Sequence, residues 1–421
     1  MGLFSSVSSY IGVDIGTSSI KLVELENFKN QARLKTYGYA DVKTNVLSTN
    51  IEKNNDQVAK YINFIMNKAN VQTKQVIAAL PTFSVFNFII NLPPMPKKDL
   101  DAAIKWEAKK FIPVPIDEMI LDWKILNKKK IKIPKNKSAE TQNIIKEATA
   151  EESKNNKDEI KSDNPTDKNQ DLIQNLEDRP SNEENKFDDK QAKTSGVKDP
   201  SKVLGQNKDD GKNYRILLTA APKNLVARYI DIFKRAKLNL LSLETEAFAL
   251  ARALMGNDTS TVMIVDIGAT TADICVIEDS VPILNRGIDT GGNHITKTIM
   301  NSMNVNKDRA EQFKRDFGLS SISNKNVPDV IQRSLNSIIN EIKYVFELYR
   351  RQGNAQIDKI IITGGSAFLP SLTSYLSELL KLPVVIGDPW DRIIYPLDLK
   401  PVLQEIGPRM AVSIGLASRD I

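Results

Sequence analysis

The sequence contains a single cysteine, Cys275, and a single histidine, His294, among 421 residues. One thiol cannot build a disulfide framework, and this usage fits a reducing cytosol. A metal site of cysteine and histidine ligands, or a Cys–His nucleophile, would lack its partner residues. We therefore expect Cys275 to be a core residue of an apolar strand and His294 to lie beside a glycine-rich turn.

Long hydrophobic runs are also missing. Apolar segments such as "RILLTAA" (215–221) and "KIIITGG" (359–365) have the length of strands, far short of the roughly 20 residues of a membrane-spanning helix. Two common nucleotide-binding motifs, G-x-x-x-x-G-K-[ST] and G-x-G-x-x-G, do not occur. The net charge of +6 is spread over a long chain, and we do not expect nucleic acid as a partner.

One segment has little apolar content of any kind. Residues of about 127–213 are mostly Lys, Asn, Asp, Glu, Gln and Ser, and Phe187 is their only aromatic residue. Such a segment buries too little apolar surface to offset the entropy of ordering, which predicts a disordered insertion. Its basic start, "NKKKIKIPKNK", can touch acidic lipid or a partner, but a solvated tether is the simpler interpretation.

The flanks of this segment predict a small module. A strand (84–93), a helix (97–112) and a strand (118–126) precede the segment, and another strand (214–221) follows it. The last two strands can pair as a hairpin whose connection is the long insertion. Elsewhere strands alternate with helices, predicted over 56–70, 223–238 and 329–353, as in an α/β architecture.

Two similar stretches, "IGVDIGTSSIKLVEL" (11–25) and "VMIVDIGATTADICVI" (262–277), stand far apart in the chain. Each is an apolar strand, Asp-Ile-Gly, a small turn with hydroxyl side chains and a second strand, which predicts a hairpin whose N–H groups and hydroxyls face phosphate oxygens. The turn residues are Gly16, Thr17 and Ser18 in the first copy, and Gly268, Thr270 and Thr271 in the second.

The strand ends of both hairpins supply charged side chains. Asp14 and Asp266 are carboxylates of the kind that hold hydrated Mg²⁺ beside phosphate. Lys21, on the returning strand of the first copy, can meet a phosphate. Each hairpin alone also fits an ordinary β-turn, but two of them in separate halves favour a shared phosphate site.

A third segment, "IDKIIITGGSAFLPSL" (357–372), is an apolar strand that ends in Gly364, Gly365 and Ser366. We expect a helix to follow directly, so that a flat ligand or its phosphates can press against the backbone at the helix N-terminus. An ordinary strand-to-helix turn is the alternative.

Together, the three segments resemble the phosphate-one, phosphate-two and adenosine motifs of the actin, heat-shock chaperone and sugar kinase ATPase superfamily. "DTGGNHITKTI" (289–299) and "AEQFKRDFG" (310–318) resemble its prokaryotic cytoskeletal branch. The resemblance implies ATP and Mg²⁺ as cofactors and Asp14 and Asp266 as metal-binding and catalytic residues. It also implies that Gly291 and Gly292 lie near the phosphates, that Glu311 and Lys314 contact ribose and base, and that Phe368 belongs to the adenosine site.

The module after "VIAALP" (76–81) is similar to that of two families in the superfamily, the FtsA cell-division proteins and the PilM type IV pilus assembly proteins. "IKWEAKKFIPVPIDEMILDWKIL" (104–126) and "SLETEAFALARAL" (242–254) resemble the PilM family, and the usual C-terminal anchor of FtsA is not expected after "IGLASRDI" (414–421). This resemblance implies an actin-like (ribonuclease H-like) two-domain ATPase fold with an inserted strand-helix-strand-strand subdomain.

The resemblance also sets the expected domain boundaries. The first actin-like domain comprises residues 1–83, 222–258 and 402–421, the inserted subdomain residues 84–221, and the second actin-like domain residues 259–401 with an inserted subdomain of its own.

The implied partners are the N-terminal peptide of PilN and other pilus machine components, including motor ATPases. The implied location is the cytoplasmic side of the inner membrane, and a homo-oligomer remains open. Two alternatives remain: an FtsA-like division protein, and a sugar or acetate-type kinase, for which no base beside an acceptor hydroxyl is found.

Hydrolysis requires a residue that orients the attacking water. Glu246, in "LETEAF" (243–248), is the candidate, although it can equally be a first-turn helix residue that complements the helix dipole. Ala269 stands where stronger hydrolases of the superfamily have a glycine, so we expect weak ATPase activity at most.

Overall fold

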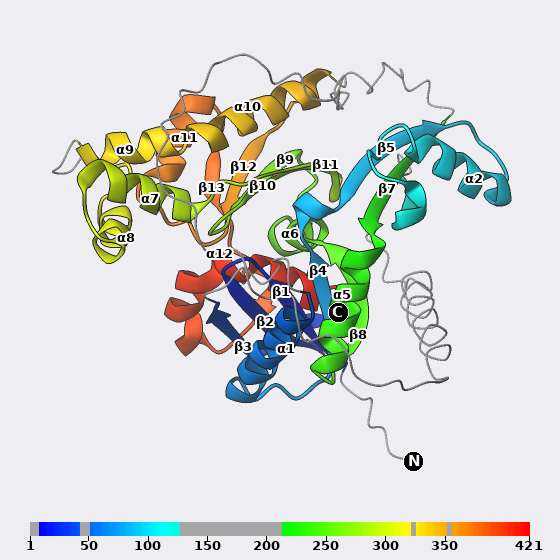
Figure 1. Ribbon diagram of the computed structural model, residues 1–421, viewed down its shortest axis with the longest axis horizontal. Helices are drawn as coiled ribbons and strands as arrows, with labels where there is room; N and C mark the ends of the chain where they lie inside the picture. The colour runs from blue at the N-terminus through cyan, green and yellow to red at the C-terminus, as the bar shows by residue number, and fades with distance from the viewer. Residues whose placement is uncertain (1–7, 43–50, 127–212, 321–325, 352–355) are drawn as a thin grey trace, which may run out of the picture.

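The computed structural model describes residues 8–42, 51–126, 213–320, 326–351 and 356–421 (Figure 1). Apart from its last residue, the insertion predicted over 127–213 lies outside this part of the chain. The described residues form an α/β structure with three sheets.

The first sheet has six strands in the order β14-β3-β2-β1-β4-β8. Its strands are β1 (Ser9–Ile15), β2 (Ser19–Phe28), β3 (Gln31–Asp41), β4 (Gln75–Leu80), β8 (Asn239–Thr245) and β14 (Ile393–Ile394). The strands β1, β2 and β3 are antiparallel neighbours, whereas β4 pairs in parallel with β1 and with β8. The helices α1 (Ile51–Lys68) and α5 (Lys223–Arg235) share a core with one face of this sheet.

The second sheet repeats this plan in the order β11-β10-β9-β12-β13. Its strands are β9 (Val262–Ile267), β10 (Ala272–Glu278), β11 (Val281–Ile288), β12 (Lys359–Thr363) and β13 (Val384–Ile386). The first three are again antiparallel, and β12 is parallel to β9. The strand β9 is apolar almost throughout because both of its faces are covered.

Five helices belong to this second half. They are α7 (Gly292–Met303), α8 (Lys307–Asp316), α9 (Asn326–Ser334), α10 (Asn336–Arg351) and α11 (Leu372–Leu380). Buried residues of all five join one core with the second sheet. In Figure 1, α7, α8 and α9 lie together at one side of this half.

Two helices, α6 (Glu246–Leu254) and α12 (Lys400–Ala417), lie between the two large sheets (Figure 1). They pack very closely, since a Cβ atom on Gly415 of α12 would overlap the backbone of Ala249 in α6. The core around them takes Ile77 from the first sheet and Ile264 from the second, both fully buried. The two halves therefore share one continuous layer of packed helices.

The module predicted between the halves is confirmed. Its elements are β5 (Phe86–Leu92), α2 (Lys97–Ala108), β6 (Met119–Leu126) and β7 (Tyr214–Pro222). The strand order is β5-β7-β6, and β6 and β7 are antiparallel neighbours in which Leu126 lies opposite Arg215. The strands on either side of the insertion are thus hairpin partners, and the module projects to one side of the molecule in Figure 1.

The single helix predicted over 329–353 is wrong. The structure has α9 and α10, separated at Leu335, whose N–H is shared between the carbonyls of Ile331 and Gln332. The hydroxyl of Ser334 donates to the Ile331 carbonyl at 2.6 Å. The Ile331 carbonyl also keeps its ladder bond from the Leu335 N–H at 3.1 Å, and the sharing of this N–H with Gln332 marks a tighter turn at which the two helices meet.

The prediction that a helix follows Ser366 directly is also wrong. Residues 364–371 form turns, and α11 begins only at Leu372. The N–H of Ser366 donates to the Ile267 carbonyl, and the carbonyl of Pro370 accepts from Leu319. These bonds to other segments, together with the left-handed backbone at Ser371 (φ 61°), prevent an earlier helix start.

Three further features bear on the sequence analysis. Strand β14 pairs with β3, so residues 393–394 lie in the first sheet although they fall within the segment expected for the second domain. Cys275 is buried in β10, as predicted. In the described part of the chain no helix combines the length and the apolar composition required to cross a membrane.

Candidate functional site

The two predicted hairpins form and have the same turn geometry. In the first turn (residues 16–19) the N–H of Gly16 donates to the Ser19 carbonyl at 3.0 Å, and in the second turn (residues 268–271) the N–H of Gly268 donates to Thr271 at 3.0 Å. The repeat seen in the sequence is therefore a repeat of backbone structure. Each copy lies where two central strands of a large sheet are joined.

The two turns meet each other. The hydroxyl oxygens of Thr17 and Thr270 lie 2.5 Å apart, although 253 positions separate the residues in the chain. Both turns thus lie at one site, with one contribution from each half. Main-chain N–H groups and small hydroxyls that converge in this way can bind phosphate oxygens.

The residues behind the turns differ between the copies. In the first hairpin Asp14 lies opposite Lys21, and the ammonium donates to Oδ2 at 2.7 Å. In the second hairpin Asp266 lies opposite Asp273, a second carboxyl in the place of the lysine. One buried oxygen of Asp273 has no hydrogen-bond partner. The site therefore combines one buried ion pair with a pair of facing carboxyls.

The electrostatics reflect this excess of carboxyls. Burial raises the pKa of Asp266 to about 6, with Asp14 adding to the rise and Lys21 opposing it. Burial, together with Glu246, Asp266 and Asp14, raises the pKa of Asp273 well above its usual range. Burial works to lower the pKa of Lys21, but the attraction of Asp14 and Asp266 raises it overall, so this residue stays an ammonium.

Glu246 reaches the same site from the first turn of α6, close enough for Asp14 and Asp266 to act on its charge. Its Oε2 accepts two hydrogen bonds from Thr82, from the N–H at 3.0 Å and from the hydroxyl at 2.9 Å. Burial and the neighbouring charge of Asp14 raise the pKa of Glu246 to about 7, although the bonds from Thr82 oppose the rise. Near neutral pH this carboxyl is poised between its two protonation states, as a group that handles a water proton requires.

The Gly-Gly turn at the start of α7 packs against the second turn. The N–H of Gly292 donates to Gly268 at 2.9 Å, and the N–H of Asn293 donates to Ala269 at 2.8 Å. A Cβ atom on Gly291 would lie 2.6 Å from the Gly268 carbonyl oxygen, so only glycine fits here. This places the positive end of α7 beside the expected phosphates.

Glu311 and Lys314 form a hydrogen-bonded group on α8. The Lys314 ammonium donates to Glu311 Oε1 at 2.9 Å, to the Thr296 hydroxyl at 2.9 Å and to the Gly292 carbonyl at 3.3 Å. Burial lowers the pKa of Lys314 although Glu311 opposes the shift. A Cβ atom on Gly292 would approach the hydroxyl of Ser366 at 2.6 Å, which joins this group to the third motif.

The third motif also borders the carboxyls. Gly364 has φ of +88°, and a Cβ atom there would overlap Oδ1 of Asp266. This position requires glycine for both its conformation and its space. Gly365 follows it, whereas the ring of Phe368 is half exposed on the turn beyond.

All predicted site segments therefore lie around one site, but sequence reasoning gave no role to three residues there. Asp273 had a detectable signal, because aligning the two repeats places it at the position of Lys21. Thr82 and Arg409 had none, since each comes from a distant segment. Arg409, on α12, donates to Asp41 at 2.9 Å at the rim of the first hairpin.

These residues fit a nucleotide with Mg²⁺. Among the described residues no three His, Cys, Asp or Glu side chains gather as ligands of one metal ion. Asp14 and Asp266 would therefore share Mg²⁺ with phosphate oxygens and water, which is the coordination that this ion commonly adopts. The unpartnered buried oxygen of Asp273 is a further acceptor beside them, suited to a water of the ion.

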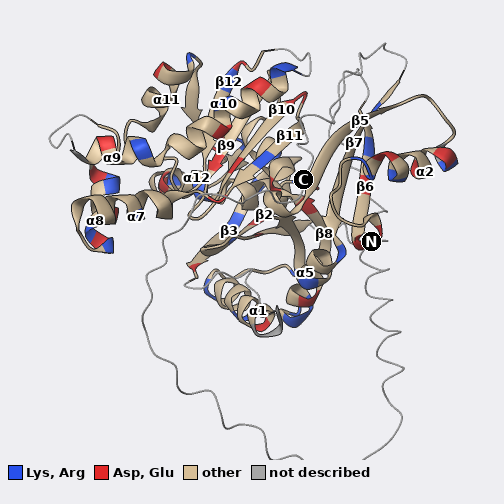
Figure 2. Ribbon diagram, turned by 45° about the horizontal axis from the view of Figure 1, so that its top comes forward, with Lys and Arg blue, Asp and Glu red and all other residues tan. Residues whose placement is uncertain are grey.

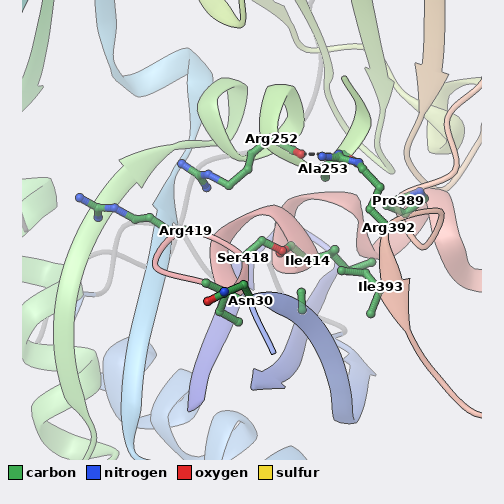
Figure 3. Close-up of a pocket in the computed structure, with 11 residues that line it drawn as sticks. Asn30, Arg252, Ala253, Pro389, Arg392, Ile393, Ile414, Ser418 and Arg419 are labelled. Atoms are coloured by element: carbon green, nitrogen blue, oxygen red, sulfur yellow. Dashed lines mark hydrogen bonds between the residues drawn. The ribbon is translucent and has the colours of Figure 1, made fainter. Parts of the chain in front are cut away.

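A separate pocket of about 250 Å³ lies at the C-terminal ends of α6 and α12 (Figure 3). Its arginines serve the fold: Arg252 binds Glu244 and the Gly415 carbonyl, and Arg392 donates to the carbonyls of Arg252 and Ala253 at the end of α6. None of the predicted site residues lines this pocket.

A solved structure of known proteins shares the fold. A PilM-PilN type IV pilus biogenesis complex matches with a TM-score of 0.69 at 22% identity, over 98% of this chain and 98% of the other. This likeness confirms the predicted actin-like two-domain fold, with its inserted subdomain.

Among curated proteins, the cell division protein FtsA of Borreliella burgdorferi is 26% identical over 37% of this chain and 41% of its own length. The FtsA of Neisseria meningitidis is 23% identical over 52% of this chain and 57% of its own length. The chain thus spans about half the length of the curated relatives it matches.

The family model described as type IV pilus assembly protein PilM matches residues 12–162 and 200–421, which is most of the chain. This extent confirms the resemblance seen in the sequence and sets the FtsA proteins apart as distant relatives. The chain belongs to the PilM family of type IV pilus assembly proteins.

Proposed function

We propose that this chain binds ATP with Mg²⁺ between its two halves and, in that state, binds the cytoplasmic N-terminal peptide of PilN. In this role it is a scaffold at the cytoplasmic face of the inner membrane that connects PilN to the motor ATPases. The observation that carries the proposal is the meeting of the two turns at Thr17 and Thr270, with carboxyls from both halves behind them.

In this proposal each group of the cleft has a role. The first and second turns bind the β- and γ-phosphates, Lys21 offsets their charge, and Asp14 and Asp266 hold Mg²⁺, which neutralises the triphosphate. The turns at Gly291 and at Gly364 leave room for the α-phosphate and the adenosine. Glu311 and Lys314, already hydrogen-bonded to each other, present a polar edge to ribose and base.

Glu246 is the residue that we propose to orient water in this cleft. Thr82 fixes one of its oxygens through two hydrogen bonds, which leaves the other oxygen for a water molecule. With a pKa of about 7, Glu246 is partly protonated at neutral pH and supports slow hydrolysis, in keeping with a nucleotide that mainly sets the shape of a scaffold.

The inserted module offers the surface for the peptide. Its strands β5 and β6 are each paired on one side only within the described residues, so an extended peptide can add backbone hydrogen bonds at either edge. The ring of Trp106 on α2 is 64% exposed, which is high for so large an apolar group. An aromatic anchor of this kind is typical of peptide interfaces.

One experiment tests both parts. ATP binding is measured by calorimetry with Mg²⁺, and binding of a PilN N-terminal peptide by fluorescence anisotropy with ATP, with ADP and without nucleotide. We expect Lys21→Met to weaken ATP binding at least about tenfold, because it removes a charge-assisted contact. Lys60→Met, at an exposed lysine of α1, should leave it unchanged.

For the peptide, we expect Trp106→Ala to weaken binding about tenfold or more. Phe64→Ala is a matched control, since Phe64 is also exposed on a helix and also has a lysine four positions on over its ring. Equal losses in the two variants would refute the module as the docking surface. Rapid ADP formation stimulated by a small-molecule acceptor, with the phosphoryl group recovered on that acceptor, would favour a kinase.

A further inference from the structure

Arg409 occupies a special place on α12. The preceding residue, Pro408, accepts hydrogen bonds from the N–H of Gly364 and from the Thr363 hydroxyl, both at 3.0 Å. These bonds fix this turn of α12 against the end of β12. The Arg409 side chain passes directly beside the third motif, since its Cγ lies 3.9 Å from where a Cβ atom on Gly365 would be.

From there the guanidinium extends to the opposite side of the cleft. It donates to Asp41 at 2.9 Å and lies 4.7 Å from the ring centre of Tyr39, both on β3. Tyr39 lies opposite Lys21 in the sheet, and the N–H of the next residue after Asp41, Val42, donates to Ser18 of the first turn. One side chain thus spans from the third motif to the rim of the first hairpin.

The two cations that the sequence predicted are already engaged. Lys21 is paired with Asp14, and Lys314 with Glu311. Beside Asp14 stand the carboxyls of Asp266, Asp273 and Glu246, whose charges act on one another. A polyphosphate entering this cleft needs further positive charge.

Arg409 is the cation whose present partner is easiest to replace. The side chain of Asp41 is 73% exposed and that of Arg409 33%, so their ion pair is solvated and contributes little. The positive charge of Arg409 works to lower the pKa of Lys21, because two like charges disfavour the ammonium form. A guanidinium can bind phosphate oxygens through two parallel hydrogen bonds, in a bidentate geometry. The solvated contact with Asp41 has one such bond.

We propose that Arg409 is a phosphate-binding residue of this cleft, which exchanges Asp41 for a phosphate oxygen of a nucleoside di- or triphosphate. This inference rests on the proposed nucleotide binding and adds to it a residue from the helix that joins the two halves. In the bound state Arg409 connects the phosphates to the helix turn that holds Gly364. Tyr39 keeps the guanidinium at the rim while the partner changes.

Calorimetry with ADP, ATP and adenosine in the presence of Mg²⁺ tests the exchange. We expect Arg409→Ala to weaken ADP and ATP binding about tenfold or more, while adenosine binding stays within about twofold. Asp41→Asn removes the competing carboxylate and should tighten ADP binding about two- to threefold. Lys400→Ala, which removes an exposed positive charge from the start of the same helix, should have no effect.

The outcomes separate this inference from the proposed function. If the unmodified protein binds none of the ligands, the proposed nucleotide binding itself fails. If it binds ADP and Arg409→Ala binds ADP equally well, only the role of Arg409 is overturned. Equal weakening of ADP and adenosine would assign Arg409 to the fold alone and overturn it too, as would weaker ADP binding by Asp41→Asn.

Discussion

At the residue scale, the main feature is the group of buried carboxyls behind the two turns. Glu246, Asp266 and Asp273 all have pKa values above their usual range, mainly because they are buried. The folded protein therefore holds protons that the unfolded chain releases. Such groups contribute stability below the pKa of the unfolded chain, and this contribution is lost as the pH rises through the higher folded values.

We predict that the protein without nucleotide or Mg²⁺ becomes less stable between about pH 4, near the pKa values of the unfolded carboxyls, and about pH 7, the pKa of the folded Glu246. Glu246→Gln should remove part of this loss, because an amide stays neutral and still accepts the bonds from Thr82. The expected gain in the free energy of unfolding at pH 8 is on the order of 2 kcal/mol, with almost none near pH 4. Urea unfolding at a series of pH values measures it.

The exposed Glu405 of α12 provides the control, since Glu405→Gln should leave the pH dependence unchanged. A Glu246→Gln curve parallel to that of the unmodified protein would contradict the assignment of a raised pKa to this carboxyl.

Residue identities in the site were predictable where they belong to a repeated local motif. Asp14, Gly16, Asp266 and Gly268 stand at equivalent positions of two hairpins, and the pattern needs only local strand and turn geometry. Thr82 and Arg409 could not be predicted, because they reach the cleft through tertiary packing that no short-range pattern records.

At the element scale, α12 is the helix on which both halves depend. It packs against β1 of the first sheet and α6, and its Pro408 carbonyl binds the end of β12 in the second sheet. A Cβ atom at Gly12 in β1 would overlap the Ser413 carbonyl, so the helix lies almost in backbone contact with the strand. Small residues permit this approach.

Gly415→Ala tests this packing through the sign of its effect. In an exposed helix, glycine to alanine stabilises by roughly 0.5–1 kcal/mol. Here the added methyl group would overlap Ala249, so we predict a loss of about 1–3 kcal/mol in the free energy of unfolding, as in other overpacked cores. Denaturant unfolding measures it.

For comparison, Val402→Ala on the exposed side of the same helix should change stability by less than about 0.5 kcal/mol. A Gly415→Ala protein as stable as the parent would mean that α6 and α12 can move apart at little cost.

The existence and type of most elements followed from apolar spacing. In α5, Val226, Tyr229, Ile230 and Phe233 recur at helical intervals and are buried. The spacing did not reveal the end of α9, because Ile331, Leu335 and Ile339 keep a helical period across the break. The break shows only in the backbone, where the Leu335 N–H is shared between the carbonyls of Ile331 and Gln332, and an apolar pattern does not contain this feature.

At the scale of the whole molecule, charges of both signs are interspersed on the outer helices α1, α2 and α8 (Figure 2). The inserted module is held chiefly by its own core, which combines Leu100 and Ile104 of α2 with Ile216 and Leu218 of β7. The insertion joins two strands that are already neighbours, so its length need not affect the fold.

We predict that deletion of residues 128–212 leaves the fold intact, because Leu126 and Arg215 remain opposite each other and three residues suffice for the turn. The melting temperature should change by no more than a few degrees. Circular dichroism and thermal unfolding measure this, with peptide binding as a second readout. An unfolded product would refute the view of this segment as dispensable for the core.

The overall fold could be recognised from three short motifs in their order along the chain, since each marks a fixed place in a two-domain arrangement. The meeting of the two turns could only be inferred, because the contact between Thr17 and Thr270 depends on how two sheets pack across α6 and α12. Domain boundaries depend on segments that pass from one half to the other, such as β14, which pairs with β3 of the first sheet. A strand of two residues is too short to be predicted from an apolar pattern.

The position of α12 has a consequence for how this protein is made. The first strand described, β1, is covered on one side by the last helix described, with Gly12 beside Ser413. During synthesis, the face of the first sheet that packs against α12 therefore stays uncovered until α12 itself has been made. At roughly 5–20 residues per second, the first sheet keeps an exposed apolar face for tens of seconds. A ribosome that stops short of α12 releases a chain whose two halves both lack a surface, so truncated products should be substrates for chaperones and proteases rather than partly working proteins.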